Sequence, residues 1–201
     1  GGGIFGANWH LAGRQLVKSN TWKDTIACGD YLVKNGYTSP AKMALAGTGA
    51  GAIAVGRAVT ERPDLWAVAS TEAGMLDPLR AETSAGGALD TPEFGSARDR
   101  QQFNGLLEMD AFHHVQDGTK YPATLLAASL DDPRVPAWES MKTAARLQAA
   151  STSGKPVLLR LEGDGGRGLG ATRQQDEALV ADRWAFMLWQ FGDARFQPGV
   201  K

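Results

Sequence analysis

Short apolar runs alternate with longer amphipathic stretches along most of the chain. The apolar runs have the length of strands buried on both faces of a parallel sheet, and they lie at residues 43–46, 65–70, 123–128 and 157–161. The amphipathic stretches have a helical period, and they lie at residues 21–36, 52–60, 98–109, 137–150 and 176–191. Strands that alternate with helices are typical of an α/β fold with a mostly parallel sheet. Because no internal repeat is present, the pattern predicts one α/β domain over residues 1–201.

Local signals predict where several of these elements begin and end. Thr21 is the predicted N-cap of the first helix, and Gly36 is predicted to end it. Ser39-Pro40 predicts the turn into the first strand. Residues 72–95 have no clear period and are rich in Gly, Ala, Thr and Pro. A connection of that length is more typical of a functional segment than of a simple link, so we predict a loop at the rim of a site.

Several apolar side chains are predicted to belong to the core rather than to a ligand site. Trp138, Trp184 and Trp189 lie on helical patterns, where aromatic residues usually face the interior. Cys28 follows Ile26 and Ala27 on another helical pattern, so we predict a small buried residue. Since it is the only cysteine, the chain has no internal disulfide.

The stretch from residue 42 to 56 contains the strongest functional signal. An apolar run breaks into Gly47-Thr48-Gly49-Ala50-Gly51, and an Ala-rich helical pattern follows. Strand, tight glycine turn and helix form the setting of a nucleophile elbow, in which Gly-x-Ser-x-Gly exposes a serine hydroxyl at the top of a sheet. Gly49 stands at the position of that serine. The sequence therefore predicts the backbone of a serine hydrolase without its attacking atom.

Two further features follow predicted strands. Asp131 and Asp132 come just after the strand at 123–128, and a Gly-rich segment at 163–170 comes just after the strand at 157–161. Ligands and catalytic groups in open parallel sheets collect beyond the carboxyl ends of the strands. The order along the chain, elbow, acid and Gly-rich loop, is the order Ser, Asp, His of an α/β-hydrolase.

Longer motifs support a family resemblance over nearly the whole chain. They are Trp9-His10-x-x-Gly13, Gly36-Tyr37-Thr38-Ser39-Pro40, Thr60-Glu61-Arg62-Pro63-Asp64-Leu65, Pro92-Glu93-Phe94-Gly95, Asp117-Gly118-Thr119-Lys120-Tyr121-Pro122-Ala123-Thr124-Leu125-Leu126 and Asp132-Pro133-Arg134-Val135-Pro136. With these motifs the chain resembles the catalytic domain of the prolyl oligopeptidase family of serine peptidases. The resemblance implies an α/β-hydrolase fold with helices on both faces of the sheet. It also implies a partial domain, because family catalytic domains begin several strands earlier and usually accompany a β-propeller.

The resemblance implies triad positions at Gly49 for the nucleophile, Asp132 for the acid and Arg167 for the base. Arg167 stands in Gly166-Arg167-Gly168, where the family has Gly-His-Gly. Glycine has no nucleophile, and arginine stays protonated at a pKa of about 12 or above, so it accepts no proton at neutral pH. We therefore expect an inactive homologue, and we expect Asp132 to pair with Arg167 instead of orienting a histidine.

The resemblance also implies three substrate-binding positions. The amide of Ala50 follows the apex of the elbow, and Arg134 matches a family arginine that contacts the substrate backbone. Asp90 stands near the position of the proline-stacking tryptophan of well-known members, so proline specificity is doubtful even for an active relative. Alternatives for Arg134 and Asp132 are structural: Arg134 braces its loop, and Asp132 caps a turn before Pro133.

A few other residues are candidates for a replacement nucleophile, a replacement base or a metal site. Thr48 lies one position before the apex, so its hydroxyl should point elsewhere than the serine's. His113 and His114 are the only histidines besides His10, and local hydrogen bonds are the simpler explanation for both. Cysteine, histidines and carboxylates show no spacing typical of a metal site, so we predict neither a metal nor a cofactor.

Composition and charge limit the partners. A formal net charge of −1 with scattered Lys and Arg gives no reason to expect nucleic acid or an anionic membrane. No apolar run approaches the roughly 20 residues that cross a bilayer, and the start does not resemble a signal peptide. We expect a soluble protein of the cytoplasm or periplasm whose ligand is a peptide or a small substrate-like molecule, and the oligomeric state stays open.

Three hypotheses about function remain open at this point. The first is a catalytically inactive member of the family that keeps a peptide-binding cleft or only the structural role of the fold. The second is a working hydrolase with replacement groups, such as Thr48 with His113 or His114. The third is a decayed or excised piece without independent function, which would fold poorly because missing strands expose a sheet edge.

Overall fold

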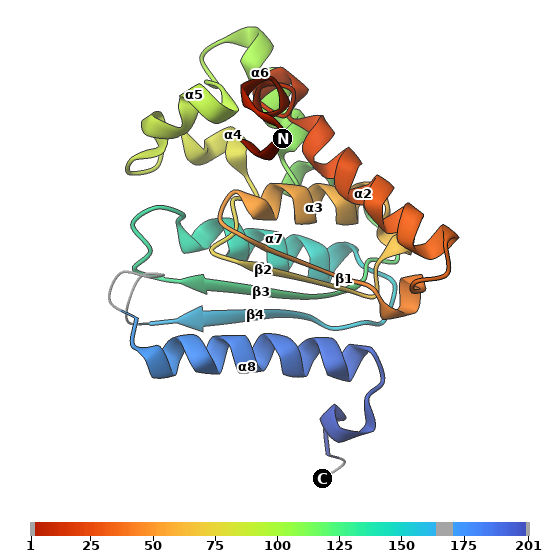
Figure 1. Cartoon of the computed structure of the whole chain (residues 1–201). Coiled ribbons are helices and arrows are strands. Elements are labelled where there is room, and N and C mark those ends of the chain that lie inside the picture. The colour runs from red at the N-terminus through yellow and green to blue at the C-terminus, as the bar shows by residue number, and fades with distance from the viewer. Residues whose placement is uncertain (1–2, 164–170, 200–201) are drawn as a thin grey trace.

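A computed structural model describes residues 3–163 and 171–199 (Figure 1). Four parallel strands form one sheet in the order β1-β2-β3-β4, and they are β1 Ala44–Thr48, β2 Val68–Glu72, β3 Ala123–Ser129 and β4 Val157–Glu162. The register pairs Thr48 with Glu72 and Glu72 with Ala127, so the carboxyl ends of β1, β2 and β3 lie along one edge. This arrangement confirms the predicted α/β class with a parallel sheet.

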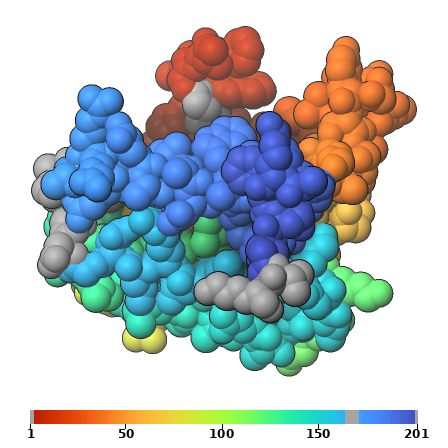
Figure 2. All heavy atoms as spheres, turned by 90° about the horizontal axis from the view of Figure 1, so that it is seen from below, coloured from red at the N-terminus to blue at the C-terminus, as the bar shows by residue number. Residues whose placement is uncertain are grey.

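Helices cover both faces of the sheet. One face carries α3 Gly51–Glu61 and α7 Ala137–Ala150, with α2 Ser19–Lys34 packed beyond α3 (Figure 1). The other face carries α8 Arg173–Gln190, the outermost helix in the view from below (Figure 2). The remaining helices form a cap with the N-terminal segment, and they are α1 Ala7–Leu11, α4 Pro78–Ala81, α5 Thr91–Phe94 and α6 Arg100–Met109. Among the described residues, no helix is long and apolar enough to cross a membrane.

Several predicted boundaries need correction. The helix predicted at residues 21–36 is α2, which begins at Ser19, so Thr21 is not its N-cap. The predicted strand at 65–70 is shifted, because Leu65 ends a short 3-10 turn and β2 begins at Val68. The predicted loop at 72–95 contains two short helices and a 3-10 turn, all too brief to produce a visible period. The last helix begins at Arg173, after a capping box of Thr172 and Gln175.

The core has one cluster on each side of the sheet. The cluster under α3 and α7 includes Trp22, Ile53 and Leu126, and the cluster under α8 includes Leu125 and Phe186. Almost every apolar side chain of α3 and β3 is buried. A polar face therefore remains only on the outer helices, as expected for a sheet covered on both sides.

Two predicted core residues are exposed. Cys28 lies on the solvent face of α2, where the neighbouring Gly29 faces the core instead. Trp184 is 57% exposed on α8, because Phe186 and Met187 occupy the face toward the sheet. Trp138 is half-buried, and Trp189 packs against the α8 cluster. Helical period alone did not distinguish the two faces in these cases.

The N-terminal segment is held by polar contacts to α5. His10 Nε2 lies 2.7 Å from one oxygen of Glu93, and Lys18 Nζ lies 2.7 Å from the other. Gln15 donates a hydrogen bond to the carbonyl oxygen of Pro92 at 3.0 Å. Two of the sequence motifs, at 9–13 and 92–95, are therefore neighbours in space, which explains why both residue sets occur together.

We expect Gly47→Ala to lower the free energy of unfolding by about 1–3 kcal/mol. A Cβ at Gly47 would lie 2.6 Å from the carbonyl oxygen of Gly51 and 2.7 Å from Val55 Cγ2, so strand and helix would have to separate. Gly51→Ala is the matched control, since a Cβ there meets nothing within 4 Å. Urea denaturation measures both, and a Gly47→Ala chain as stable as the parent would contradict the tight packing of β1 against α3.

Candidate functional site

The elbow has the backbone expected of a strained turn between β1 and α3. Gly49 has a φ of 57°, in the left-handed region that glycine occupies without a steric penalty. Its N–H donates to the carbonyl oxygen of Glu72 at 3.0 Å, and its own carbonyl accepts from the amides of Ala52 and Met75 at 3.1 and 3.0 Å. The apex is thereby tied to the end of β2 and to the loop beyond it. Ala50, the N-cap of α3, is exposed next to this apex.

Asp132 lies in the turn that follows β3. Its Oδ1 accepts hydrogen bonds from the amides of Arg134 and Val135 at 2.8 and 3.0 Å, and its own amide donates to Ser129 at 3.3 Å. Asp132 therefore has the turn-capping role that the sequence offered as one alternative. Asp131 and Arg134 are exposed beside it. Gly49 and Asp132 follow strands two positions apart, so roughly 10 Å separates these strand ends.

The third predicted feature follows β4. Arg167 and the rest of residues 164–170 lie outside the described residues, so the predicted pair of Asp132 with Arg167 stays a prediction. The chain is described again from Ala171, just before α8. The ends of β1 and β3 thus place two of the three predicted triad positions, Gly49 and Asp132, at the same edge of the sheet.

A small cavity of about 40 Å³ lies between the ends of β2, β3 and β4 and the start of α8. Two acids at its rim are in ion pairs: Glu72 lies 3.6 Å from Arg183, and Glu162 lies 2.6 Å from Arg160. Ala73 at the same rim has a φ of 43°, which is rare for a residue with a Cβ. The cavity has room for water-sized groups only.

A larger cleft of about 600 Å³ lies between the segment that follows β2 and α7. Arg80 and residues 83–85 line it from the segment after β2, and Trp138 and Lys142 line it from α7. Its volume is within the range of ligand pockets in other proteins. The segments that form it also carry two predicted substrate-binding residues: Asp90 is exposed on the first, and Arg134 comes shortly before α7 on the second.

The two neighbouring histidines have local partners. His113 Nδ1 lies 3.0 Å from Asp110 Oδ1, and His114 Nδ1 lies 2.7 Å from the carbonyl oxygen of Asp110. Both imidazoles belong to a 3-10 turn, Phe112–His114, that packs on α3 and α7. The explanation of both histidines by local hydrogen bonds is therefore confirmed.

A buried polar group that sequence reasoning missed connects the loop after β2 with α7. Glu139, on the inner face of α7, accepts hydrogen bonds from the amides of Leu76 and Asp77 at 2.8 and 2.9 Å. Burial raises the pKa of Glu139 to about 8; the hydrogen bond from the Leu76 amide opposes this increase, and the nearby Asp110 carboxylate adds to it. Lys142, one turn further along α7, forms an ion pair with Asp77. In the sequence, Glu139-x-x-Lys142 resembles an ordinary surface pair, so only its position in the fold reveals it.

Comparisons with known proteins agree with this geometry. A family model described as the prolyl oligopeptidase family matches residues 1–194. A prolyl endopeptidase of Elizabethkingia meningoseptica is 40% identical over 96% of this chain, and the dual function macrocyclase-peptidase POPB of Amanita bisporigera is 34% identical over 96%. A solved structure of prolyl oligopeptidase B from Galerina marginata, bound to a 35mer hydrolysis and macrocyclization substrate, superposes with a TM-score of 0.90 at 31% identity over 96% of this chain. In each case the chain spans 27% of the relative's length.

Proposed function

Since the chain belongs to the prolyl oligopeptidase family, we propose that it is a non-catalytic part of a peptidase-like protein that binds peptides without cleaving them. The observation that carries the proposal is Gly49, which stands at the apex of the elbow in the left-handed backbone and offers no side chain. Because the chain spans about a quarter of its relatives' length, the activities of those whole proteins are starting points for this proposal only.

The argument for lost catalysis is chemical. A serine attacks only when a neighbouring base takes its proton, and the arginine at position 167 cannot do so near neutral pH. Losing one triad member lowers turnover by roughly four to six powers of ten, and losses within a triad are not additive. Gly49 with Arg167 therefore leaves at most the background that binding alone provides.

The argument for peptide binding rests on what remains around the elbow. α3 begins at Gly51, directly after the elbow, and a helix N-terminus favours a carbonyl oxygen or an anion. The cleft of about 600 Å³ and the exposed Arg134 lie on the segments that follow β2 and β3. The Galerina relative binds a 35mer peptide substrate, so a peptide is the ligand class we propose.

We expect the chain to remain unlabelled by a fluorophosphonate probe, which reports an activated serine or threonine. The Elizabethkingia prolyl endopeptidase is the positive control. Labelling that disappears in Thr48→Ala would contradict the proposal and support a hydrolase with a replacement nucleophile.

We also expect Arg134→Ala to weaken binding of a fluorescent proline-containing peptide about tenfold, as for loss of a charged hydrogen bond. Fluorescence anisotropy measures the affinity. Lys155→Ala is the matched control, since Lys155 precedes β4 and lies at the opposite edge of the sheet. Equal effects of both substitutions would show that general charge attraction, rather than the proposed cleft, holds the peptide.

A further inference from the structure

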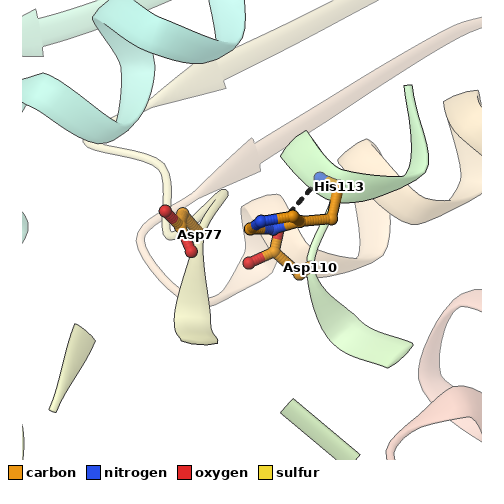
Figure 3. A group of neighbouring side chains, drawn as sticks. All are labelled: Asp77, Asp110 and His113. Carbon is orange, nitrogen blue, oxygen red and sulfur yellow. Dashed lines mark hydrogen bonds and ion pairs between the residues drawn. The ribbon is translucent and has the colours of Figure 1, made fainter. Parts of the chain in front are cut away.

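Three side chains from two distant parts of the sequence meet beside α4 (Figure 3). Asp77 is the residue before α4, Asp110 follows α6, and His113 lies in the 3-10 turn after it. One potential ligand atom of each lies within 4.8 Å of the other two. We propose that Asp77, Asp110 and His113 form a binding site for a divalent transition-metal ion, with Zn²⁺ as the ion that suits the donors best.

The geometry is close to that of a coordination sphere. Ligand atoms about 2.0–2.2 Å from one ion lie about 3.0–4.4 Å from each other, according to the angle between them. His113 Nδ1 and Asp110 Oδ1 are 3.0 Å apart, within that range. Asp77 approaches from the opposite side, and Figure 3 shows its carboxylate and that of Asp110 directed toward each other. The 4.8 Å bound exceeds the upper end of that range, so the Asp77 carboxylate would move closer to the other two ligands when an ion binds.

Two buried carboxylate oxygens without a hydrogen bond provide independent support for a cation site. The side chains of Asp77 and Asp110 are fully buried. Asp77 Oδ1 and Asp110 Oδ2 form no hydrogen bond of normal geometry, although buried polar atoms almost always do. The backbone amide of Leu79 is also close enough to the Asp110 carboxyl group to lower its pKa. Each carboxylate is anchored through its other oxygen, Asp77 by the Lys142 ammonium and Asp110 by the backbone amide of His113 at 2.9 Å. The free oxygens are therefore held in place and available to a ligand.

The charge balance of the cluster also favours a cation. The two buried aspartates, Asp77 and Asp110, have one ammonium group beside them, that of Lys142, which pairs with Asp77. The Lys142 ammonium also lies 4.1 Å from the centre of the Phe112 ring, so it is shared between partners. Burying a carboxylate without compensation costs several kcal/mol, and a divalent ion between the two aspartates would remove that cost.

The donor chemistry and the access route are consistent with Zn²⁺. Two carboxylate oxygens and one imidazole nitrogen form a typical three-ligand set, with water as the fourth ligand, whereas Ca²⁺ and Mg²⁺ prefer oxygen alone. The His113 side chain is 39% exposed, so an ion can enter along its ring from solvent. The bound ion would fasten the start of α4 to the turn after α6.

Isothermal titration calorimetry with ZnCl₂ on the chelator-treated chain tests the site. All chains carry Cys28→Ser, because the exposed thiol of Cys28 also binds zinc. We expect one Zn²⁺ per chain. Since even an outer-shell substitution lowers metal affinity about 10- to 100-fold, His113→Gln should weaken binding at least tenfold.

His114→Gln is the matched control. It is the adjacent histidine, its side chain is 30% exposed, and its Nδ1 faces a backbone carbonyl rather than the two carboxylates. It should bind Zn²⁺ within about twofold of the parent, well under the tenfold loss expected for a ligand. Equal losses in the two variants, or no binding at about 1 mM Zn²⁺, would overturn the proposal and indicate that the carboxyl groups share a proton instead.

A melting experiment provides a readout that does not depend on heat of binding. At 100 times its Kd, Zn²⁺ should lower the ratio of unfolded to folded chain about 100-fold. The midpoint of thermal unfolding should therefore rise for the parent and for His114→Gln, and rise clearly less for His113→Gln, whose ratio of unfolded to folded chain falls at most about 10-fold at the same Zn²⁺ concentration. A rise of equal size in all three chains would place the bound zinc elsewhere. Because the His113 side chain contacts the buried Asp110, circular dichroism of each variant without zinc should accompany these measurements.

Discussion

The chain that carries both Gly49→Ser and Arg167→His is expected to react with a fluorophosphonate probe, at a rate on the order of 10⁴ times that of the parent. The left-handed backbone at residue 49 would present the serine hydroxyl at the top of the sheet, as in a nucleophile elbow. A histidine at position 167 restores a base with a pKa near neutrality. Asp132 is already held at the matching strand end.

Each single variant should stay unlabelled, because a serine without a base and a base without a serine are both inactive. Gly49→Ala with Arg167→His is the closest control: it adds the same Cβ at a φ of 57° and no hydroxyl. Any non-glycine residue there is strained by about 1–3 kcal/mol, so circular dichroism should accompany each measurement. A folded but unreactive double variant would show that more than two side chains separate this chain from its active relatives. Arg167 lies outside the described residues, so its part in the prediction rests on the sequence.

Glu139→Gln is expected to make the folded chain more stable than the parent at neutral and higher pH. The pKa of Glu139 is about 8 in the folded chain against 4.5 as its ordinary value, because burial penalises the charged form. A raised pKa means that the folded state holds a proton that the unfolded state has lost. The stabilising contribution of that proton is complete below pH 4.5 and is lost as the pH rises to about 8.

Glutamine removes this loss and keeps the contacts. Its amide oxygen accepts the N–H groups of Leu76 and Asp77, as Glu139 Oε2 does. The difference in the free energy of unfolding between variant and parent should be near zero at pH 4 and grow by roughly 1 kcal/mol per pH unit from about pH 5. It should level off near pH 8 at a few kcal/mol. Urea denaturation across this range, without added metal, measures the difference.

Glu177→Gln is the control for a general charge effect, because Glu177 is 63% exposed on α8 and pairs only with Arg173 among the described residues. Its difference from the parent should stay within about 0.5 kcal/mol at every pH, as for other exposed i, i+4 pairs. A flat difference for Glu139→Gln would mean that Glu139 is ionised in the folded chain at neutral pH, with Lys142 or a bound cation as its counter-charge.

Much of the architecture could be predicted because its causes are local. Periodicity located each of the four strands and five longer helices to within a few residues, since a buried strand and a covering helix each repeat their own pattern. The short helices α4 and α5 escaped, because four residues make no full period. Cys28 and Trp184 were wrongly predicted to be buried. A helix that packs through a narrow apolar strip leaves its other apolar residues exposed, and the helical period does not distinguish the two sets.

What the sequence determined by itself is the fold class and the family, and the proposed loss of two triad side chains rests on it alone, because Gly49 and Arg167 are assigned from motifs and chain order. Only the tertiary structure decided which polar groups are buried together. Asp77, Glu139 and the neighbouring pair of Asp110 and His113 come from three separate segments, and no spacing along the chain connects these segments. The raised pKa values of Asp110 and Glu139, the unpaired carboxylate oxygens and the proposed cation site all result from burial, a property that a residue acquires only from its neighbours in space.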